Sequence, residues 1–275
     1  MEYNYKIFVP GGNKTALIIG IESDIDKRKI IQDMILLKHR DVEQVGFVNE
    51  NFSDPQLVMS GGEFCGNATR SAVYFYLGGK PGEISINVSG TTRPLAAGIT
   101  DSFETWTEMP VYENLDKITT IDDELYFVEM EGISHLVLSQ KVSFPYLSKT
   151  NLSEDGKRLK HIAKSLLMYY GFYGKCDCGV IFTENVLSMI KIHPCIFTKR
   201  SATEYYETAC GSGSAAVGLV NSKLLGKSDK LQILQPSGKV IETSVEYKNG
   251  KIVNTKIGGF VSIDNLSEKD LNVIV

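Results

Sequence analysis

Hydrophobic and polar residues alternate over short stretches of this chain, which is the pattern of half-buried β-strands. In the first half the predicted strands cover 5–9, 16–21, 44–48 and 56–59. The second strand should pair back on the first, because Pro10-Gly11-Gly12-Asn13 between them has the composition of a turn. A helix is predicted after Ser23-Asp24, where an N-cap precedes apolar residues at helical spacing.

The second half repeats this order loosely. Predicted strands cover 126–130, 135–138, 233–245 and 253–263, whereas the short strands expected between 84 and 111 belong to the first half. A helix from about Ser153 to Tyr170 has apolar residues on one face. Two more helices are predicted, one from Cys65 to Gly78-Gly79 and one from Cys210 to near Gly226, because glycine commonly ends a helix.

Strands with one long helix and one cysteine-capped helix, given twice, predict the α+β class with mixed or antiparallel sheets. Strands and helices do not alternate strictly enough for a doubly wound parallel sheet. We expect two pseudo-symmetric halves, 1–115 and 116–262, and no Pro/Ser-rich linker marks the boundary.

The chain has 275 residues, a formal net charge of −4 and 43% hydrophobic residues, as in an ordinary globular protein. This charge gives no basic face for nucleic acid and no polybasic anchor for a membrane. No apolar run approaches the ~20 residues that span a bilayer, and residues 1–6 lack the basic-then-apolar order of a signal peptide. We therefore expect a cytoplasmic protein with neither nucleic acid nor membrane as partner. The oligomeric state stays open, a homodimer being one option.

Two short stretches repeat each other about half the chain apart: Glu63-Phe64-Cys65-Gly66-Asn67-Ala68-Thr69 and Glu207-Thr208-Ala209-Cys210-Gly211-Ser212-Gly213-Ser214. In each, a cysteine and a glycine precede small and apolar residues that predict a helix. A thiol at a helix N-terminus lies where the macrodipole and the first backbone N–H groups favour its anion. Two such thiols on opposite faces of one carbon can act as acid and base, which is the chemistry of a racemase or epimerase.

The first N–H groups of the two helices, those of Gly66, Asn67, Gly211 and Ser212, have no acceptor within their helix and can hold a substrate carboxylate. Removal of the α-proton spreads charge onto that carboxylate, so the same donors stabilise the transition state. No cofactor and no metal is then needed. The nearby Glu63, Glu207 or His135 could bias which sulfur holds the proton.

Three other interpretations compete with this one. Each Cys-Gly pair could simply cap a buried helix, although two matched copies make that less attractive. A cysteine hydrolase could use one thiol with His135 as base, but the second copy would then have no role. Cys176-Asp177-Cys178 with His193-Pro194-Cys195 could bind zinc, but this spacing is not a common zinc pattern and buried thiols are the simpler reading. With five cysteines and no export signal, a disulfide framework is not expected.

At these residues the chain resembles the cofactor-independent racemases of the diaminopimelate epimerase superfamily. The family's C-G-N and A-C-G-[ST]-G turns match Cys65-Gly66-Asn67 and Ala209-Cys210-Gly211-Ser212-Gly213. Gly12-Asn13 resembles its entry turn, Gln44 its substrate-contacting glutamine, Gly132-Ile133-Ser134-His135 its G-N-P-H and Gln235-Pro236-Ser237-Gly238 its late P-G-G turn. The resemblance implies a sheet wrapped around a central helix in each half, with 263–275 returning to the first. It also implies substrate contacts by Asn13 and Gln44.

The departures concern the far end of the substrate. Diaminopimelate epimerases hold it with asparagines and an E-R pair, whereas here Ile133 replaces the G-N-P-H asparagine and Arg200 is only offset from the E-R position. Gln44-Val45-Gly46-Phe47 and the run 57–69 resemble most a subgroup that racemises histidine. The flat ring of histidine would suit a pocket of Met59, Ile133, Tyr205 and Tyr206. A diaminopimelate epimerase with an altered distal site is the alternative, and a non-catalytic amino-acid-binding relative is a third.

Overall fold

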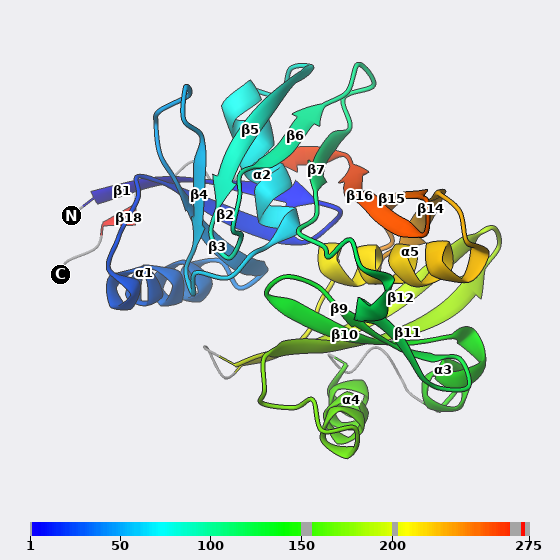
Figure 1. Ribbon diagram of the computed structural model, residues 1–275. Coiled ribbons are helices and arrows are strands. Elements are labelled where there is room, and N and C mark those ends of the chain that lie inside the picture. Colours follow the sequence, from blue (N-terminus) through cyan, green and yellow to red (C-terminus); the bar gives the residue numbers. More distant parts are fainter. Residues whose placement is uncertain (1, 150–155, 200–202, 265–270, 273–275) are drawn as a thin grey trace. The chain divides into compact units, whose positions relative to one another are not determined.

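The computed structural model describes residues 2–149, 156–199, 203–264 and 271–272. The protein is a mixed α+β structure dominated by strands (Figure 1). It consists of two compact units, Met1–Glu108 with Gly258–Val275 and Met109–Ile257. None of the described helices is long and apolar enough to cross a membrane.

The first unit contains one mixed sheet. Its strands are β1 (Glu2–Pro10), β2 (Lys14–Ile19), β3 (Val42–Val48), β4 (Gln56–Met59), β5 (Gly82–Val88), β6 (Leu95–Ile99), β7 (Thr105–Glu108), β17 (Val261–Ile263) and β18 (Leu271–Asn272). They pair in the order β1-β2-β3-β4-β5-β6-β7, and β17 and β18 lie antiparallel on the free edge of β1. The pairs β2–β3 and β4–β5 are parallel and the other pairs are antiparallel.

Each parallel pair of this unit is joined through a helix, as parallel connections require. α1 (Ile25–Lys38) follows β2 and α2 (Gly66–Leu77) follows β4. Strands contact α2 from several sides (Figure 1), and most of its residues are buried. Small residues such as Gly66, Ala68 and Ala72 let these strands approach the helix axis. α1 covers a second core, formed by residues such as Ile31, Ile35 and Phe47.

The second unit also consists of mixed parallel and antiparallel strands. Its strands are β8 (Ile118–Asp122), β9 (Leu125–Glu129), β10 (Ile133–Leu138), β11 (Asp177–Val186), β12 (Met189–Thr198), β13 (Thr203–Tyr206), β14 (Asp229–Leu234), β15 (Val240–Lys248) and β16 (Lys251–Gly259). β10–β11 and β12–β14 are parallel, whereas β8–β9, β9–β10, β11–β12, β12–β13 and β14–β15 are antiparallel.

Helices again follow the parallel connections of this unit. α5 (Gly211–Leu225) lies between β13 and β14 and is buried over most of its length. α4 (Lys157–Tyr169) covers the apolar core on the other side of the sheet, which includes Leu159, Phe182 and Phe197. The unit also contains a 3-10 turn, η1 (Leu115–Lys117), and α3 (Gln140–Leu147).

The predicted helix ends are largely confirmed. Asp24 caps α1, α2 ends before Gly78 and α5 before Gly226, and both glycines are left-handed (φ 58° and 63°). α3 was not predicted, because Pro145 inside it argues against a helix and only Ser139 marks its N-cap. The predicted start of α4 at Ser153 lies outside the described residues.

Gly90 gives a test of the loop that leads into α2. Its φ is +77°, and a Cβ there would lie 2.4 Å from the backbone N of Phe64. Gly238 has the same backbone strain (φ +78°) with nothing within 4 Å of its Cβ position. Gly238→Ala should therefore cost only the left-handed strain of roughly 1–2 kcal/mol, and Gly90→Ala a further ~1–3 kcal/mol from the clash. Urea unfolding measures both, and equal losses would contradict the close approach.

Candidate functional site

Cys65 is the N-cap of α2. Its backbone is extended (φ −138°, ψ 113°), its Sγ accepts a hydrogen bond from the N–H of Ala68 at 3.3 Å, and its carbonyl accepts from Thr69 Oγ1 at 2.8 Å. The first intrahelical backbone bond runs from Thr69 N to Cys65 O. Any acceptor for the N–H groups of Gly66 and Asn67 must therefore come from outside the helix.

Gln44 is joined directly to this thiol. The Cys65 Sγ–H donates to Gln44 Oε1 at 2.9 Å, from strand β3. Asn13 lies at the start of β2, where its Nδ2 donates to Glu43 Oε2 at 2.7 Å. Asn13 and Cys65 thus contact consecutive residues of β3, Glu43 and Gln44; their role in binding a substrate stays a prediction.

The loop between β4 and α2 is fixed by Ser89, which sequence reasoning missed. Its Oγ accepts from Met59 N at 2.9 Å and donates to the carbonyl of Glu63 at 2.7 Å. The serine follows β5, and nothing in the local pattern distinguishes it from other turn residues. It holds the predicted supporting residue Glu63 two positions before the thiol.

Cys210 has the same geometry in the second unit. It is the N-cap of α5 with φ −124° and ψ 109°, and its Sγ accepts from the N–H of Gly213 at 3.3 Å. Its carbonyl accepts from Ser214 Oγ at 2.7 Å. The repeated sequence turn thus produces a repeated cap, with Gly211 and Ser212 in the positions that Gly66 and Asn67 hold in α2.

His135 reaches this second thiol through Ser212. The Ser212 Oγ lies 3.5 Å from Cys210 Sγ and 3.0 Å from His135 Nε2. His135 is fully buried, and burial lowers the pKa of its ring to about 3, so the imidazole is neutral at physiological pH. Its Nδ1 has no hydrogen-bond partner among the described residues. The ring fits because Gly179 is its partner on β11, where a Cβ would lie 2.6 Å from Nδ1.

Gln235 is a second polar residue whose role the sequence does not show, although it belongs to the Gln235-Pro236-Ser237-Gly238 turn named above. Its Oε1 accepts from the N–H of Cys210 at 2.9 Å, and its Nε2 donates to Ser214 Oγ and to the Ile233 carbonyl. The side chain is fully buried. A glutamine directly after the apolar end of β14 is the one signal that could have marked it.

Burial is the largest cause that raises the pKa of the Cys210 thiol well above its ordinary value, and the carboxylate of Glu207 raises it further. The Ser212 hydroxyl and the Gly213 N–H act in the opposite direction but do not outweigh these causes. A raised pKa means that the thiol, not the thiolate, is the form present near neutral pH. The predicted supporting residue Glu207 thus favours protonated Cys210.

The structure only partly supports the pocket expected for the far end of the substrate. Met59 is 1% exposed and belongs to the core around α2, and Tyr206 is a core residue whose OH lies 2.8 Å from His193 Nδ1. Placing these two in a pocket was therefore wrong, because apolar and aromatic residues on strands pack in the core first. Arg200 lies outside the described residues.

Tyr205 has the opposite orientation to Tyr206. It pairs with Ile196 in the β12–β13 register, whereas Tyr206 pairs with Cys195. Alternate strand residues point to opposite faces, so Tyr205 shares the sheet face of Ile196. Ile196 and His135 are both neighbours of Gly179 on that face. Tyr205 is 39% exposed and is the aromatic residue on the side of the second thiol.

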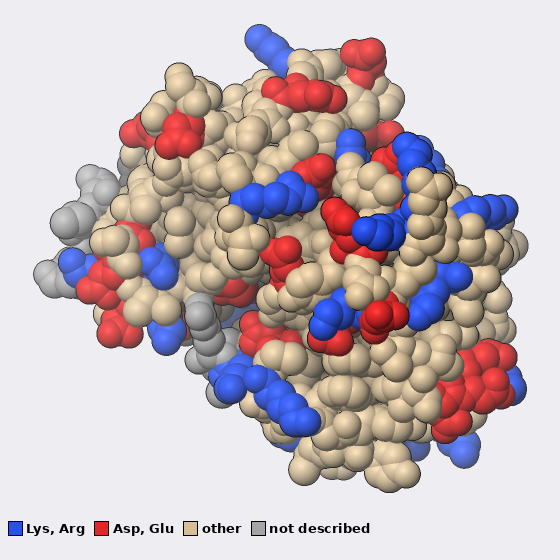
Figure 2. Space-filling view, in the orientation of Figure 1, with Lys and Arg blue, Asp and Glu red and all other residues tan. Residues whose placement is uncertain are grey.

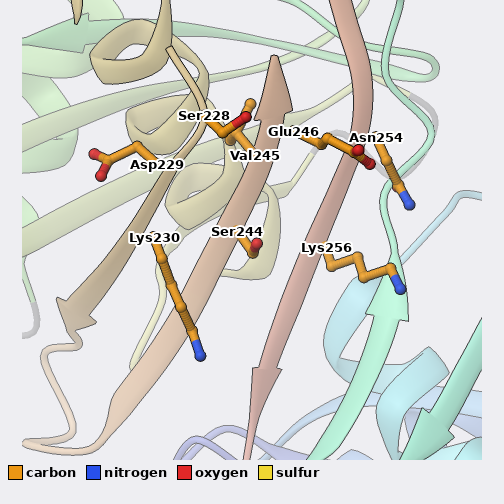
Figure 3. A pocket seen from close by; sticks show the side chains of 8 residues that line it. All are labelled: Ser228, Asp229, Lys230, Ser244, Val245, Glu246, Asn254 and Lys256. Carbon is orange, nitrogen blue, oxygen red and sulfur yellow. The ribbon is translucent and has the colours of Figure 1, made fainter. Parts of the chain in front are cut away.

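A polar groove of about 520 Å³ lies elsewhere in the second unit (Figure 3). Its lining residues come from the segment after α5 and from β14, β15 and β16: Ser228, Asp229, Lys230, Ser244, Val245, Glu246, Asn254 and Lys256. Cys210 begins α5 whereas Ser228 follows its end, and 15 helical residues span ~22 Å. The groove contains no thiol and is separate from the cysteine site.

The described residues contain no group of three or more His, Cys, Asp or Glu side chains placed to hold a metal ion. Cys178 and Cys195 are buried in the core under α4, and Cys176 is exposed.

On the face drawn in Figure 2, Lys and Arg side chains are interspersed with Asp and Glu.

Solved structures with this fold include isomerases. The chain superposes with a TM-score of 0.65 on a probable proline racemase of Agrobacterium radiobacter K84, at 12% identity over 99% of this chain and 93% of that one. A hydroxyproline epimerase of Agrobacterium vitis gives 0.64 at 11% identity, covering 98% and 92%. A phenazine biosynthesis protein of the PhzF family from Enterococcus faecalis gives 0.60 at 17%, covering both chains in full. At these identities the likeness shows the fold alone.

Sequence relatives specify the class. A histidine racemase of Fusobacterium nucleatum subsp. nucleatum (strain ATCC 23726) is 27% identical over 259 residues, 88% of this chain and 91% of that protein. One from Staphylococcus aureus (strain Mu50) is 24% identical, covering 86% of each chain. Together with the fold, these relatives make the protein an isomerase of the amino-acid racemase class. Residues 2–266 match the family described as "Histidine racemase CntK N-terminal domain", and the chain belongs to that family.

The electrostatics of Cys210 can be tested with two opposite substitutions. Glu207→Gln removes a negative charge that raises the pKa of the thiol, so the pKa should fall. Ser212→Ala removes a hydroxyl that lowers it, so the pKa should rise. The pH dependence of Cys210 alkylation by a small iodoacetamide reagent, with peptide mapping by mass spectrometry, measures both. Shifts in the same direction would contradict the assigned causes, and thermal melting controls for folding.

Proposed function

We propose that this protein interconverts L- and D-histidine at Cα by a cofactor-independent two-base mechanism, with Cys65 and Cys210 as acid and base. The observation that carries the proposal is that both thiols cap the N-terminus of a buried helix with the same backbone and hydrogen-bond geometry. A single capping cysteine could be structural, but the matched pair in a family of racemases favours a shared chemical role.

We further propose that the two units are pseudo-symmetric domains with a diaminopimelate epimerase-like fold. The pairings β1–β2, β2–β3, β3–β4 and β4–β5 alternate antiparallel and parallel, and β9–β10, β10–β11, β11–β12 and β12–β14 repeat that alternation. In both series the cysteine-capped helix leads into the second parallel pairing. The repeated connectivity supports a duplicated unit with one thiol in each copy.

In the proposed reaction the substrate carboxylate accepts hydrogen bonds from the first N–H groups of the two helices, those of Gly66, Asn67, Gly211 and Ser212. One cysteine thiolate takes the α-proton, and the other cysteine thiol delivers a proton to the opposite face of the same carbon. The negative charge that develops spreads onto the carboxylate, where the helix N-termini stabilise it more than in the ground state. The mechanism requires the two sulfurs on opposite faces of Cα.

Reversible racemisation needs each sulfur to be stable both as thiol and as thiolate, and the partners described above support this. The Gln44 amide accepts from the Cys65 thiol through Oε1, and after a rotation of the amide its Nε2 can donate to the thiolate. The Ser212 hydroxyl can likewise accept from or donate to Cys210, since a neutral His135 offers either a donor or an acceptor at Nε2. Both partners therefore serve either direction of the reaction.

Histidine is the proposed substrate for two reasons. The sequence relatives are histidine racemases, and Tyr205 has an exposed ring on the sheet face that carries Ile196 and His135. A planar imidazole can stack on such a ring. We also propose that a small amino acid is the ligand, that neither nucleic acid nor a membrane is a partner, that the protein is cytoplasmic, and that a homodimer is the assembly to test.

The two-base mechanism predicts that Cys65→Ala and Cys210→Ala each abolish racemisation, because each direction needs both an acid and a base. Cys→Ser at either position should be severely impaired, since a hydroxyl is a far poorer base. Circular dichroism of L-histidine solutions and deuterium incorporation at Cα in D₂O give the rates. Cys176→Ala, at an exposed thiol, should leave them unchanged.

Near wild-type racemisation by either alanine variant would disprove the mechanism. Loss of activity on dialysis against a chelator, with recovery on adding pyridoxal phosphate or zinc, would disprove cofactor independence.

Substrate choice gives a separate test. Burying the second charged amino-acid group of diaminopimelate without partners would cost several kcal/mol, so kcat/KM for histidine should exceed that for meso-diaminopimelate by at least about a hundredfold. Tyr205→Leu should raise KM for histidine, whereas Tyr205→Phe, which keeps the ring, should not. Equal turnover of the two substrates would instead favour the diaminopimelate epimerase alternative.

A further inference from the structure

Arg70 is a buried charged residue that has no role in the mechanism proposed above. It lies in α2 and is fully buried, with Nε donating to the Thr105 carbonyl at 3.0 Å and Nη2 to the Phe260 carbonyl at 3.3 Å. Nη1 approaches Asn67 Oδ1 at 3.5 Å. Burial lowers the pKa of the guanidinium to about 10, so the side chain remains a cation at neutral pH.

No carboxylate among the described residues forms an ion pair with Arg70. The carboxylate of Glu104 acts on it through a charge interaction without such contact, which raises the pKa of the guanidinium but does not outweigh burial. A buried charge without an opposite partner is costly, and such charges are usually paired. The carbonyls around Arg70 satisfy its N–H groups but carry only partial charge. The arrangement therefore places a cation in the early turns of α2 that Glu104 compensates only from outside ion-pair distance.

The N-terminal turns of α5, which follow Cys210, contain no such charge. Arg70 follows Cys65 by five residues, and the residue five after Cys210 is Ala215, which is also fully buried. The first charged residue of α5 is Lys223, in its last turn. Two otherwise matched helix N-termini thus differ by one buried cation.

We infer that Arg70 is a positioning residue that favours the thiolate form of Cys65. It adds a full positive charge to the N-terminal dipole of α2, and it holds Asn67 through the side-chain oxygen of that residue. The inference rests on the proposed function, in which one sulfur must begin as thiolate and the other as thiol. A cation near a thiol stabilises the thiolate. Cys210, buried beside Glu207 and without a cation at position 215, is left as the thiol. The free enzyme would then begin with its single thiolate on Cys65.

The test uses the substrate-free protein, so it does not depend on racemisation. The pH dependence of alkylation by iodoacetamide, read separately for Cys65 and Cys210 by peptide mapping, gives an apparent pKa for each thiol. In the wild-type protein Cys65 should react with an apparent pKa below the ordinary thiol value of about 8.5 and below that of Cys210. Arg70→Met should reduce the thiolate fraction of Cys65 near pH 7 by about tenfold, and Arg70→Lys should restore most of it.

Arg28→Met is the matched control, because Arg28 is another buried arginine of the first unit that donates to backbone carbonyls, those of Glu22, Ser23 and Ser60. It should lower the thermal stability without moving the apparent pKa of Cys65. If Arg70→Met does not fold, the wild-type comparison of the two thiols still decides. A Cys65 pKa at or above that of Cys210, or one unchanged in folded Arg70→Met, would overturn the inference. Absent racemisation with the expected thiol pKa values would instead reject only the proposed function.

Discussion

The structure of each unit depends on one constraint, the N-terminus of a helix that is buried among strands. The first backbone N–H groups of such a helix cannot be satisfied inside the helix, and bulk water does not surround it. In α2 and α5 the side chain of a cysteine satisfies one of these donors, and small residues after it allow the strands to approach. The remaining donors and the macrodipole make the site suited to an anion. The same feature that completes the helix thus places a sulfur beside donors that suit an anion.

The two units meet this constraint with different surroundings. Around Cys65 lie an amide that bonds the thiol directly and, deeper in α2, a buried arginine. Around Cys210 lie a serine, a neutral histidine, a glutamine on the backbone N–H and a glutamate. Burial and Glu207 favour the protonated sulfur at Cys210, whereas at Cys65 we infer that Arg70 favours the thiolate. In the proposed two-base reaction such a difference would set which sulfur begins as the thiolate, because two equivalent coupled thiols would share the single proton equally.

Local patterns were sufficient for the elements that border the site and insufficient for its supporting contacts. β4 (Gln56–Met59) and the glycine ends of α2 and α5 followed from composition and periodicity, since these signals act within a few residues. The partners Ser89, Gly179 and Gln235 come from strands distant in sequence, and their roles depend on strand register. Arg70 could have been noticed as a charge among the small and apolar residues of a helix predicted to be buried. Its lack of a carboxylate partner is visible only in three dimensions.

Strand alternation also separates the two functions of adjacent residues on β13. Tyr206 turns toward α4 and bonds His193 in the core, whereas Tyr205, one position earlier, lies on the sheet face that carries His135. A shift of one residue in this strand would exchange the two rings. The register of β13 against β12 therefore fixes which of the two rings is exposed on that face, while in the proposed mechanism the helix caps bind the carboxylate and carry the two sulfurs. Because the proposed tasks fall on different elements, the residue at position 205 can change without altering either helix cap.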